Sequence, residues 1–286
     1  MKGRVWDALI VGGGPAGLAA GLHLSRAGYR TLLAERRRYG GQAAGIGSLE
    51  NYPGYAGGAG EALMRDWLSQ ARRWGLKTSL DEAVRVSRNG RGHFSVRLKK
   101  GGPVKARALL WCGGAAFRSL GVPGERELSG KYVWNTGDEA PSLRGRVAAV
   151  LGGGEAAAQQ AAALAGRAKK VYLVSRGARL KAHRLLLGRL DAAGVERLPG
   201  FEAARIRPGA LELRAVGGGK DRELEADAVF VLIGKQPRRV PAGWRRAPEG
   251  FFKAGDANGE IYRQVAVAGG DGIRAAMRAI EFLEGA

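Results

Sequence analysis

Cysteine is nearly absent from this chain of 286 residues, which contains Cys112 and no other, and histidine occurs only three times. A single cysteine excludes a disulfide within the chain and any metal site built from several thiolates. With so few thiolate or imidazole ligands, we expect no bound metal ion. A chain without disulfides suits a reducing compartment, so we expect a cytoplasmic location.

Long apolar runs are also missing, since no stretch reaches the roughly 18 consecutive apolar residues that a membrane-spanning helix needs. The chain begins Met1-Lys2-Gly3-Arg4 and enters the strand-like run Val5–Val11. That run is too short for the apolar core of a signal peptide. We therefore expect neither a membrane span nor an export signal.

Acidic residues are few: 26 Asp and Glu stand against 47 Lys and Arg, which gives a net charge of +21. The excess is spread through the chain and is not gathered in an arm or a tail. Such charge can keep a surface soluble and attract phosphorylated cofactors, or it can steer an acidic protein partner toward the chain. We do not expect nucleic-acid binding, because no stacking motif or basic helix accompanies the charge.

The first segment has the pattern of a strand, a glycine turn, a helix and a second strand. The apolar run Asp7–Val11 is followed by Gly12–Gly17, and an Ala- and Leu-rich helix then continues to about Ala27. The next apolar run, Thr31–Ala34, ends in Glu35. Such a βαβ unit predicts a parallel sheet.

The same pattern returns about 140 residues later, where Val147–Leu151 precedes Gly152–Ala157 and a helix that continues to about Ala165. A further strand is expected at Lys170–Val174. Two such units predict an α/β fold with two Rossmann-like, three-layer (ββα) nucleotide-binding domains.

Turn-rich segments flank the second βαβ unit and indicate that one domain is inserted into the other. We place the inserted domain at 118–243, so that 1–117 and 244–286 form the first domain. Alternating runs at His93–Leu98 and Leu211–Ala215 predict antiparallel strands added to each domain. The glycine-rich stretch that follows the second run, Gly217–Gly219, predicts a hairpin turn.

The first glycine loop has the G-x-G-x-x-G spacing, with Gly12, Gly14 and Gly17. The first glycine permits a tight turn, the second lets a pyrophosphate approach the backbone, and the third lets the helix pack on the strand. Glu35 ends the next strand, where a carboxylate can bind ribose hydroxyls. The alternative is a glycine turn without a nucleotide, but the strand, helix and acid together favour a dinucleotide site.

Further short motifs follow this loop in order along the chain. They are Gly12–Gly17, Gly40-Gly41-Gln42, Glu50-Asn51-Tyr52-Pro53-Gly54, Leu120–Glu125, Ala254-Gly255-Asp256, Tyr262–Val265 and Gly270-Asp271-Gly272. This series resembles the thioredoxin reductase family over nearly the whole chain. The resemblance implies FAD in the first domain and a homodimer.

The resemblance also implies individual roles in the flavin domain. Glu35 would hold the adenosine ribose, Gln42 and Asn51 would approach the flavin, and Asp256 would bind the ribityl–pyrophosphate region. Gln264 and Val265 would lie beside the pyrimidine edge of the ring, where a helix over 264–277 could stabilise negative charge through its N-terminal amides. An ordinary closing helix is the alternative. The remaining implied cofactor contacts are Pro15, Ala16, Arg36, Gly41, Val84, Gly114, Gly255 and Arg263.

One flavin-domain motif departs from the family, which usually has Ala-Thr-Gly where this chain has Cys112-Gly113-Gly114. The small residues preserve the tight crossover. Because Cys112 ends the apolar run Ala108–Trp111, we interpret it as a buried apolar side chain and not as a nucleophile.

The second glycine loop has the spacing G-x-G-x-x-A, with Gly152, Gly154 and Ala157, and Glu155 begins its helix. This resembles the NADPH-binding loop of the family. No acid follows the next strand; instead there are Ser175, Arg176, Arg179 and Lys181, which favours NADPH over NADH. The family pattern is His-Arg-Arg-x-x-x-Arg, so Ser175 and Gly177 are departures, and a relic site that binds weakly is the alternative.

The redox-active Cys-x-x-Cys of thioredoxin reductases would fall within Gly130–Pro141, and neither cysteine is there. A flavin reduces a disulfide only through a thiolate that contacts it, so we do not expect direct reduction of thioredoxin by a dithiol of this chain. Trp134 or Tyr132 could cover the flavin face that the cysteines leave, or both could be core aromatics.

The resulting hypothesis is an FAD-dependent NAD(P)H oxidoreductase in which hydride passes from nicotinamide C4 to flavin N5. No side chain is assigned a catalytic role, because the cofactor supplies the chemistry. The acceptor would not be reduced through a dithiol; an acidic electron-carrier protein suits the charge, and a quinone, dioxygen or a partner's disulfide are the alternatives. Two alternatives stay open: a ferredoxin- or flavodoxin-linked reductase, and a non-enzymatic FAD-binding regulatory protein.

Overall fold

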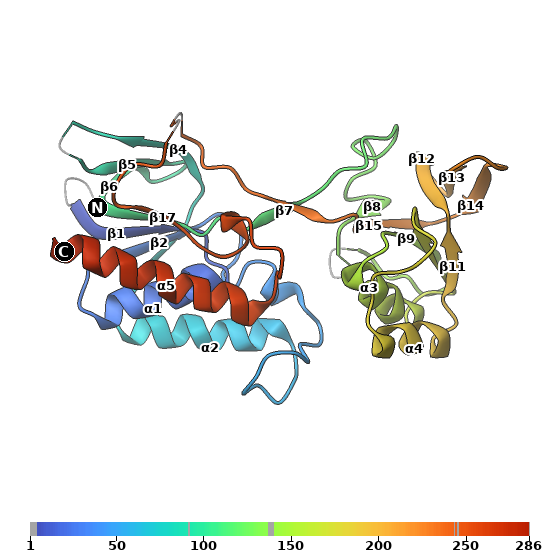
Figure 1. Cartoon of the computed structure of the whole chain (residues 1–286), viewed down its shortest axis with the longest axis horizontal. Helices are drawn as coiled ribbons and strands as arrows, with labels where there is room; N and C mark the ends of the chain where they lie inside the picture. The colour runs from blue at the N-terminus through green and yellow to red at the C-terminus, as the bar shows by residue number, and fades with distance from the viewer. Residues whose placement is uncertain (1–4, 91, 137–139, 243, 245, 286) are drawn as a thin grey trace. The chain divides into compact units, whose positions relative to one another are not determined.

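A computed structural model describes residues 5–90, 92–136, 140–242, 244 and 246–285. It divides the chain into two compact units, one formed by Met1–Ala115 with Pro237–Ala286 and the other by Ala116–Gln236 (Figure 1). Both units are Rossmann-like and of the α/β class, as the sequence predicted.

The first unit is built on a sheet with the strand order β3-β2-β1-β6-β5-β4, in which β17 also pairs with β6. The strands β3, β2, β1, β6 and β17 run parallel, whereas β5 pairs antiparallel with both β6 and β4. The strands are β1 (Val5–Val11), β2 (Thr31–Glu35), β3 (Lys77–Leu80), β4 (Ala83–Arg88), β5 (Phe94–Leu98), β6 (Gly102–Trp111) and β17 (Phe251–Lys253).

Three helices cover one face of the parallel strands, and the antiparallel strands cover the other (Figure 1). Alternate residues of β1 therefore enter two different cores: Ala8 and Ile10 face the helices, while Leu9 and Val11 face the side of Phe94. Because both faces of the strand are buried, it has a continuous apolar sequence. The helices are α1 (Pro15–Arg26), α2 (Gly60–Arg73) and α5 (Val265–Glu284), with short 3₁₀ turns η1 (Ala43–Gly45) and η2 (Gly255–Asn258).

The second unit repeats this layering. A parallel sheet of order β11-β10-β9-β15-β8 carries α3 (Glu155–Ala165) and α4 (Arg184–Ala192) on one face. A three-stranded antiparallel sheet packs against the other face. The strands are β8 (Val133–Trp134), β9 (Val147–Leu151), β10 (Lys170–Ser175), β11 (Glu196–Pro199), β12 (Phe201–Arg207), β13 (Ala210–Ala215), β14 (Arg222–Glu225) and β15 (Ala228–Val231).

The chain crosses between the units twice, at β7 (Ala115–Phe117) and β16 (Lys235–Pro237), which pair as a two-stranded sheet. The return crossing comes earlier than the sequence suggested, so that residues 237–242 belong to the first unit and residue 243 lies outside the described residues. Hydrogen bonds explain the difference: Arg238 N donates to Gly114 O at 2.9 Å, and Val86 N donates to Pro241 O at 2.9 Å.

The closing helix also differs in length from its prediction. Gln264 is the N-cap of α5, which then continues past residue 277 to Glu284. Its last turns bury Ala279 and Leu283, and it ends at Gly285, whose φ of 84° stops the helix. The extra turns are held by this burial, which a local pattern does not display.

The crossing of α1 and α5 depends on a glycine. A Cβ built at Gly272 would lie 2.1 Å from the carbonyl oxygen of Ala16, whereas a Cβ at Gly270 would meet nothing within 4 Å. We expect Gly272→Ala to lower the free energy of unfolding by about 1–3 kcal/mol through overpacking. The matched change Gly270→Ala, in the same helix, should raise it by about 0.5–1 kcal/mol. Urea denaturation of the flavin-free variants measures both, and equal effects would contradict this account.

Candidate functional site

The first glycine loop joins β1 to α1 and is built for close approach of backbones. Gly12 has a φ of +108°, and a Cβ there would lie 2.1 Å from Cys112 O. A Cβ at Gly17 would lie 1.9 Å from Gly12 O, so α1 could not pack against the loop with any larger residue. These two glycines are required by the fold itself.

Gly14 is different, because a Cβ at this position would meet nothing within 4 Å. It is the N-cap of α1, and no side chain caps the helix there. The first amides of an α-helix lack intrahelical acceptors and carry the positive end of its dipole. The open space beside an uncapped helix start therefore fits the diphosphate of a dinucleotide.

Glu35 ends β2 beside this loop and is 8% exposed. Its Oε2 accepts a hydrogen bond from Gly13 N at 2.7 Å, and its Oε1 accepts one from Arg37 N at 2.8 Å. These bonds fix the carboxylate against the glycine loop, the position that the Rossmann pattern requires of a ribose-binding acid.

Two residues that the sequence assigned to the flavin are brought together from distant segments. Asn51 Nδ2 donates to Gln264 Oε1 at 2.8 Å, across 213 positions of sequence. Gln264 is the N-cap of α5, and no side chain caps that helix start either. Another assigned residue, Gln42, donates through Nε2 to Ala115 O at 2.7 Å.

Several of the other assigned residues of the first unit lie at or beside these helix starts. A Cβ at Gly255 would lie 2.8 Å from the Ala16 side chain, and one at Gly41 would lie 3.1 Å from Gly14 Cα. Asp256 forms an ion pair with Arg263, with Oδ2 and Nε 3.9 Å apart. Of the rest, Pro15 and Val265 begin α1 and α5, Gly114 has a φ of 68°, Arg36 is exposed, and Val84 is 42% exposed on β4.

Arg238 is a residue that the sequence analysis missed. Burial, followed by the nearby positive charges of Arg36 and Arg37, lowers the pKa of its guanidinium. Trp111 Nε1 donates to Arg238 O at 3.1 Å, which holds its backbone beside the crossover next to the glycine loop. The run Arg36-Arg37-Arg38 was visible in the sequence, but only the fold brings Arg238 to it.

The second glycine loop has the same construction. Gly152 has a φ of +152°, and a Cβ there would lie 2.5 Å from Leu232 O and 2.9 Å from the Ala157 side chain. Gly154 is the N-cap of α3, and no side chain caps this helix start. A Cβ built at Gly154 would meet nothing within 4 Å. Glu155 occupies the first turn of the helix. A second dinucleotide phosphate group therefore fits here.

The segment after β10 returns to this loop. Lys181 N donates to Gly153 O at 2.7 Å, which places Lys181 at the edge of the glycine loop. Arg176, Arg179 and Lys181 are all exposed, whereas Ser175 is 4% exposed and donates through Oγ to Gly177 O at 3.0 Å. The structure thus collects three cations beside an open helix start, and Ser175 shapes the turn that carries them.

Cys112 is inert in this fold. It is 5% exposed, and burial, together with the charge of Asp271, raises the pKa of its thiol to about 12. At neutral pH the side chain is a protonated thiol without nucleophilic thiolate. The interpretation as a buried apolar residue is confirmed.

Thiol labelling measures this property directly. Because burial raises the pKa of the Cys112 thiol, the thiolate fraction at pH 8 is far smaller in the folded protein than in the unfolded chain. We expect iodoacetamide to leave Cys112 unmodified in folded protein and to modify it rapidly in urea, as followed by mass spectrometry. Rapid labelling of the folded protein would contradict the assignment.

The segment that replaces the dithiol motif includes a core residue. Trp134 lies on β8, is 5% exposed, and packs on Phe230 with ring centroids 5.9 Å apart. It is therefore a core aromatic of the second unit and is not free to cover a flavin face, while Tyr132 is half-buried. Residues 137–139 of this segment lie outside the described residues.

The described part of the chain shows neither a membrane-spanning helix nor a cluster of metal-binding side chains. Across the described ranges, no helix combines the length and apolar character that a membrane crossing requires. In the same part of the chain, no group of three or more His, Cys, Asp or Glu side chains is placed to hold a metal ion.

Comparisons with known proteins agree with the geometry. The family model described as pyridine nucleotide-disulphide oxidoreductase matches residues 6–271. The thioredoxin reductase of Bacillus subtilis (strain 168) is 31% identical, with 98% of this chain and 96% of that protein covered. The thioredoxin reductase of Treponema pallidum (strain Nichols) is 32% identical, with 98% and 97% covered.

A solved structure shows the same fold. The thioredoxin reductase of Lactococcus lactis superimposes with a TM-score of 0.92 at 24% identity, with 98% of this chain and 100% of that chain covered. The family match over residues 6–271 and the two relatives above 30% identity show the family as well as the fold. This chain belongs to the pyridine nucleotide-disulphide oxidoreductases and, among them, to the thioredoxin reductase family.

Proposed function

We propose that this chain binds FAD in its first unit and oxidises NADPH bound by its second unit. It would then pass the electrons to an acceptor without using a dithiol in this chain. The observation that carries the proposal is the assembly in the first unit of an open α1 start, a fixed Glu35 and the Asn51–Gln264 pair. The thioredoxin reductase family binds FAD and uses NADPH.

The first unit would hold FAD through groups that the structure leaves open. The α1 amides after Gly14 would bind the diphosphate, and Glu35 would bind the hydroxyls of the adenosine ribose. Asn51 and Gln264 hold each other in place at the start of α5. There the positive helix end would favour negative charge on the ring. When bound, FAD supplies the two-electron redox chemistry that no side chain of this chain can provide.

The second unit would hold NADPH in the same manner. The α3 amides after Gly154 would bind its diphosphate, and Arg176, Arg179 and Lys181 would bind the 2′-phosphate. No carboxylate follows β10 in this segment to favour the free 2′-hydroxyl of NADH. NADPH is therefore the preferred donor in this proposal.

The proposed acceptor is not thioredoxin, because this chain has no dithiol through which it could reduce the thioredoxin disulfide. The sequence contains one cysteine, and that residue is buried with a raised pKa, so the chain has no dithiol to exchange with a disulfide. The charge of +21 suits an acidic electron-carrier protein as acceptor. We further propose a homodimer, as the resemblance implied.

Anaerobic flavin reduction tests this proposal. FAD-loaded protein is mixed with NADPH and, in parallel, with NADH, and the flavin absorbance band is followed by stopped flow. We expect NADPH to bleach the band at least about tenfold faster than NADH at equal concentration. If only reduced ferredoxin or flavodoxin bleaches the band, the electron donor is a carrier protein and not NADPH. If no donor bleaches the band, the chain is an FAD-binding regulatory protein, and if it takes up no FAD the whole proposal fails.

A further inference from the structure

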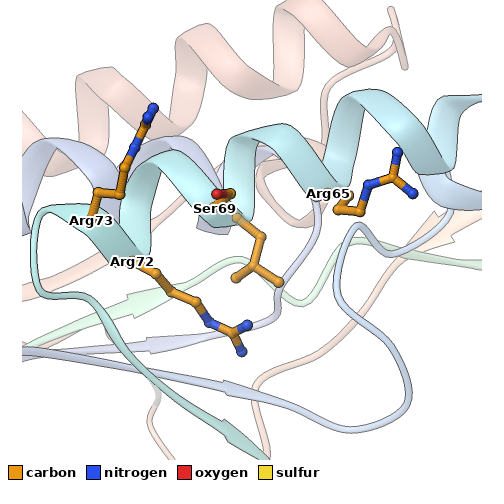
Figure 2. Close-up of a pocket in the computed structure, with 5 residues that line it drawn as sticks. Arg65, Ser69, Arg72 and Arg73 are labelled. Carbon is orange, nitrogen blue, oxygen red and sulfur yellow. The ribbon is translucent and has the colours of Figure 1, made fainter.

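The outward face of α2 gathers basic side chains around a shallow pocket of about 410 Å³. Arg65, Leu68, Ser69, Arg72 and Arg73 line it, and Figure 2 shows the polar ones extending from a single helix. We call Arg65, Arg72 and Arg73 the α2 arginine face.

The position of this face follows from helical spacing. Starting from Arg65, the other polar residues of the pocket come four, seven and eight positions later (Ser69, Arg72 and Arg73). This spacing places all four on one side of a helix. The opposite side buries Leu63, Met64 and Ala71 in the core of the first unit. All three arginines are exposed.

Two acidic residues of α2, Glu61 and Asp66, are also exposed, but in the part of the chain that the structure describes neither forms an ion pair with this face. Among the residues that the structure describes, none of the three arginines takes part in an ion pair. Arg72 is nevertheless held in place, since its Nη2 donates to Thr78 Oγ1 at 2.8 Å and its guanidinium lies 5.3 Å from the centre of the Tyr39 ring. A guanidinium fixed in this way loses little entropy when a carboxylate binds it.

Two large apolar side chains are exposed on segments next to α2 in the sequence or the fold: Trp74 follows Arg73, and Leu80 lies on β3, whose Thr78 accepts a hydrogen bond from Arg72. Trp74, the C-cap of α2, is 51% exposed, and Leu80 on the edge strand β3 is 50% exposed. The guanidinium of Arg26 lies 5.8 Å from the centre of the Trp74 ring. Tryptophan and arginine are the residue types that dominate binding energy at protein interfaces. The presence of arginine and tryptophan together favours a protein as the binding partner of this face over a free anion.

The buried side of α2 packs on the segments assigned to the flavin. Gly60 N donates to Ile46 O at 2.8 Å, and the Met64 side chain lies close to Gly40, which precedes Gly41 and Gln42. Trp67 meets the Tyr52 ring edge-on at 5.8 Å, next to Asn51. A protein bound to the outward side would thus lie one helix away from the proposed flavin loops.

We propose that the α2 arginine face docks an acidic electron-carrier protein, an inference that rests on the function proposed above. Each NADPH would release two electrons and one proton, and two one-electron carriers would each accept one electron. A second copy of this chain is disfavoured at the centre of the face, because symmetric docking would oppose like charges there. Nucleic acid is disfavoured because the arginines form a compact cluster and not a track along a backbone.

Charge reversal tests the docking surface. The variant Arg65→Glu/Arg73→Glu is compared with Arg65→Lys/Arg73→Lys, which keeps the charge, and with Arg97→Glu/Lys105→Glu. The last pair is exposed on β5 and β6 and changes the net charge equally. Arg72 is left intact because it also supports the fold. NADPH-driven reduction of flavodoxin and ferredoxin is measured at low ionic strength, together with reduction of the neutral quinone menadione and carrier binding by calorimetry.

We expect the Arg65→Glu/Arg73→Glu variant to lose about 10- to 100-fold in kcat/KM and in affinity for the carriers, with menadione reduction unchanged. The lysine variant should retain most of both, and the β5–β6 control should lose less than about threefold. The salt dependence of the carrier reaction should flatten in the first variant only.

Several outcomes would overturn the docking proposal while leaving the function intact. One is wild-type protein that reduces menadione but neither binds nor reduces flavodoxin or ferredoxin. Another is an equal loss in the β5–β6 control, which would make the effect one of net charge. A change in oligomeric state caused by Arg65→Glu/Arg73→Glu would assign the face to a second copy, and tight binding of an RNA fragment lost in that variant would assign it to nucleic acid. If NADPH does not reduce the flavin but the carriers still bind, the proposed function is wrong and the docking surface is retained.

Discussion

A Gly14→Asp variant is expected to fold normally and to be purified without flavin. Gly14 has φ and ψ of −76° and −172°, which any residue adopts, and its Cβ would point into open space. Aspartate is a good N-cap, so α1 should be as stable as before or slightly more stable. The new carboxylate, however, would occupy the space assigned to the FAD diphosphate.

The expected size of the effect follows from the charges. One carboxylate about 4 Å from a phosphate costs roughly 4 kcal/mol at an effective dielectric constant of about 20. This corresponds to a loss of FAD affinity of about 100- to 1,000-fold. The measurements are the flavin content of purified protein, the dissociation constant for added FAD, and the thermal unfolding of the flavin-free chain, which should not fall.

The isosteric variant Gly14→Asn separates charge from volume. Asparagine also caps helices well but carries no charge, so it should bind FAD more tightly than the aspartate variant does. If the Gly14→Asp protein is purified with the same flavin content as the wild type, the diphosphate does not lie at the start of α1. In that case the proposed FAD site is wrong.

The corresponding change in the second unit, Gly154→Asp, is expected to give the opposite phenotype. Gly154 is also an N-cap in extended backbone, with φ and ψ of −105° and 178°, and its Cβ would meet nothing within 4 Å. The variant should keep its flavin colour, because the first unit is unchanged. Its affinity for NADPH should fall by about 100-fold or more, for the same electrostatic reason.

Stopped-flow reduction at subsaturating NADPH measures this second effect, with dithionite as a reductant that needs no nucleotide site. We expect slow bleaching by NADPH and normal bleaching by dithionite. Loss of flavin from Gly154→Asp with retention in Gly14→Asp would reverse the assignment of the two units. Unchanged bleaching by NADPH would mean that the second loop does not bind the donor, as a relic site would behave.

Much of the fold could be predicted from the sequence because the relevant signals are local. The glycine spacing of 12–17 predicts a turn, and the run Thr31–Ala34 followed by an acid predicts a strand; each signal is contained within about six residues. The structure confirms both βαβ units and the hairpin at Gly217–Gly219. The return crossing was placed too late because residues 237–242 are held to the first unit by hydrogen bonds to Gly114 and Val86, which no local pattern displays.

The sequence by itself determined the two glycine loops, Glu35 at the tip of a strand, and a chain with one cysteine and therefore no dithiol. The conformation of a glycine loop depends on a short segment, and the cysteine count depends on composition alone. Neither needs a contact between distant parts of the chain to be inferred. Tertiary structure alone decided that Asn51 meets Gln264, that Arg238 joins Arg36 and Arg37, and that the α2 arginine face has no acidic partner among the described residues. These features depend on which surfaces remain after distant segments have packed, and that outcome is set by the whole core.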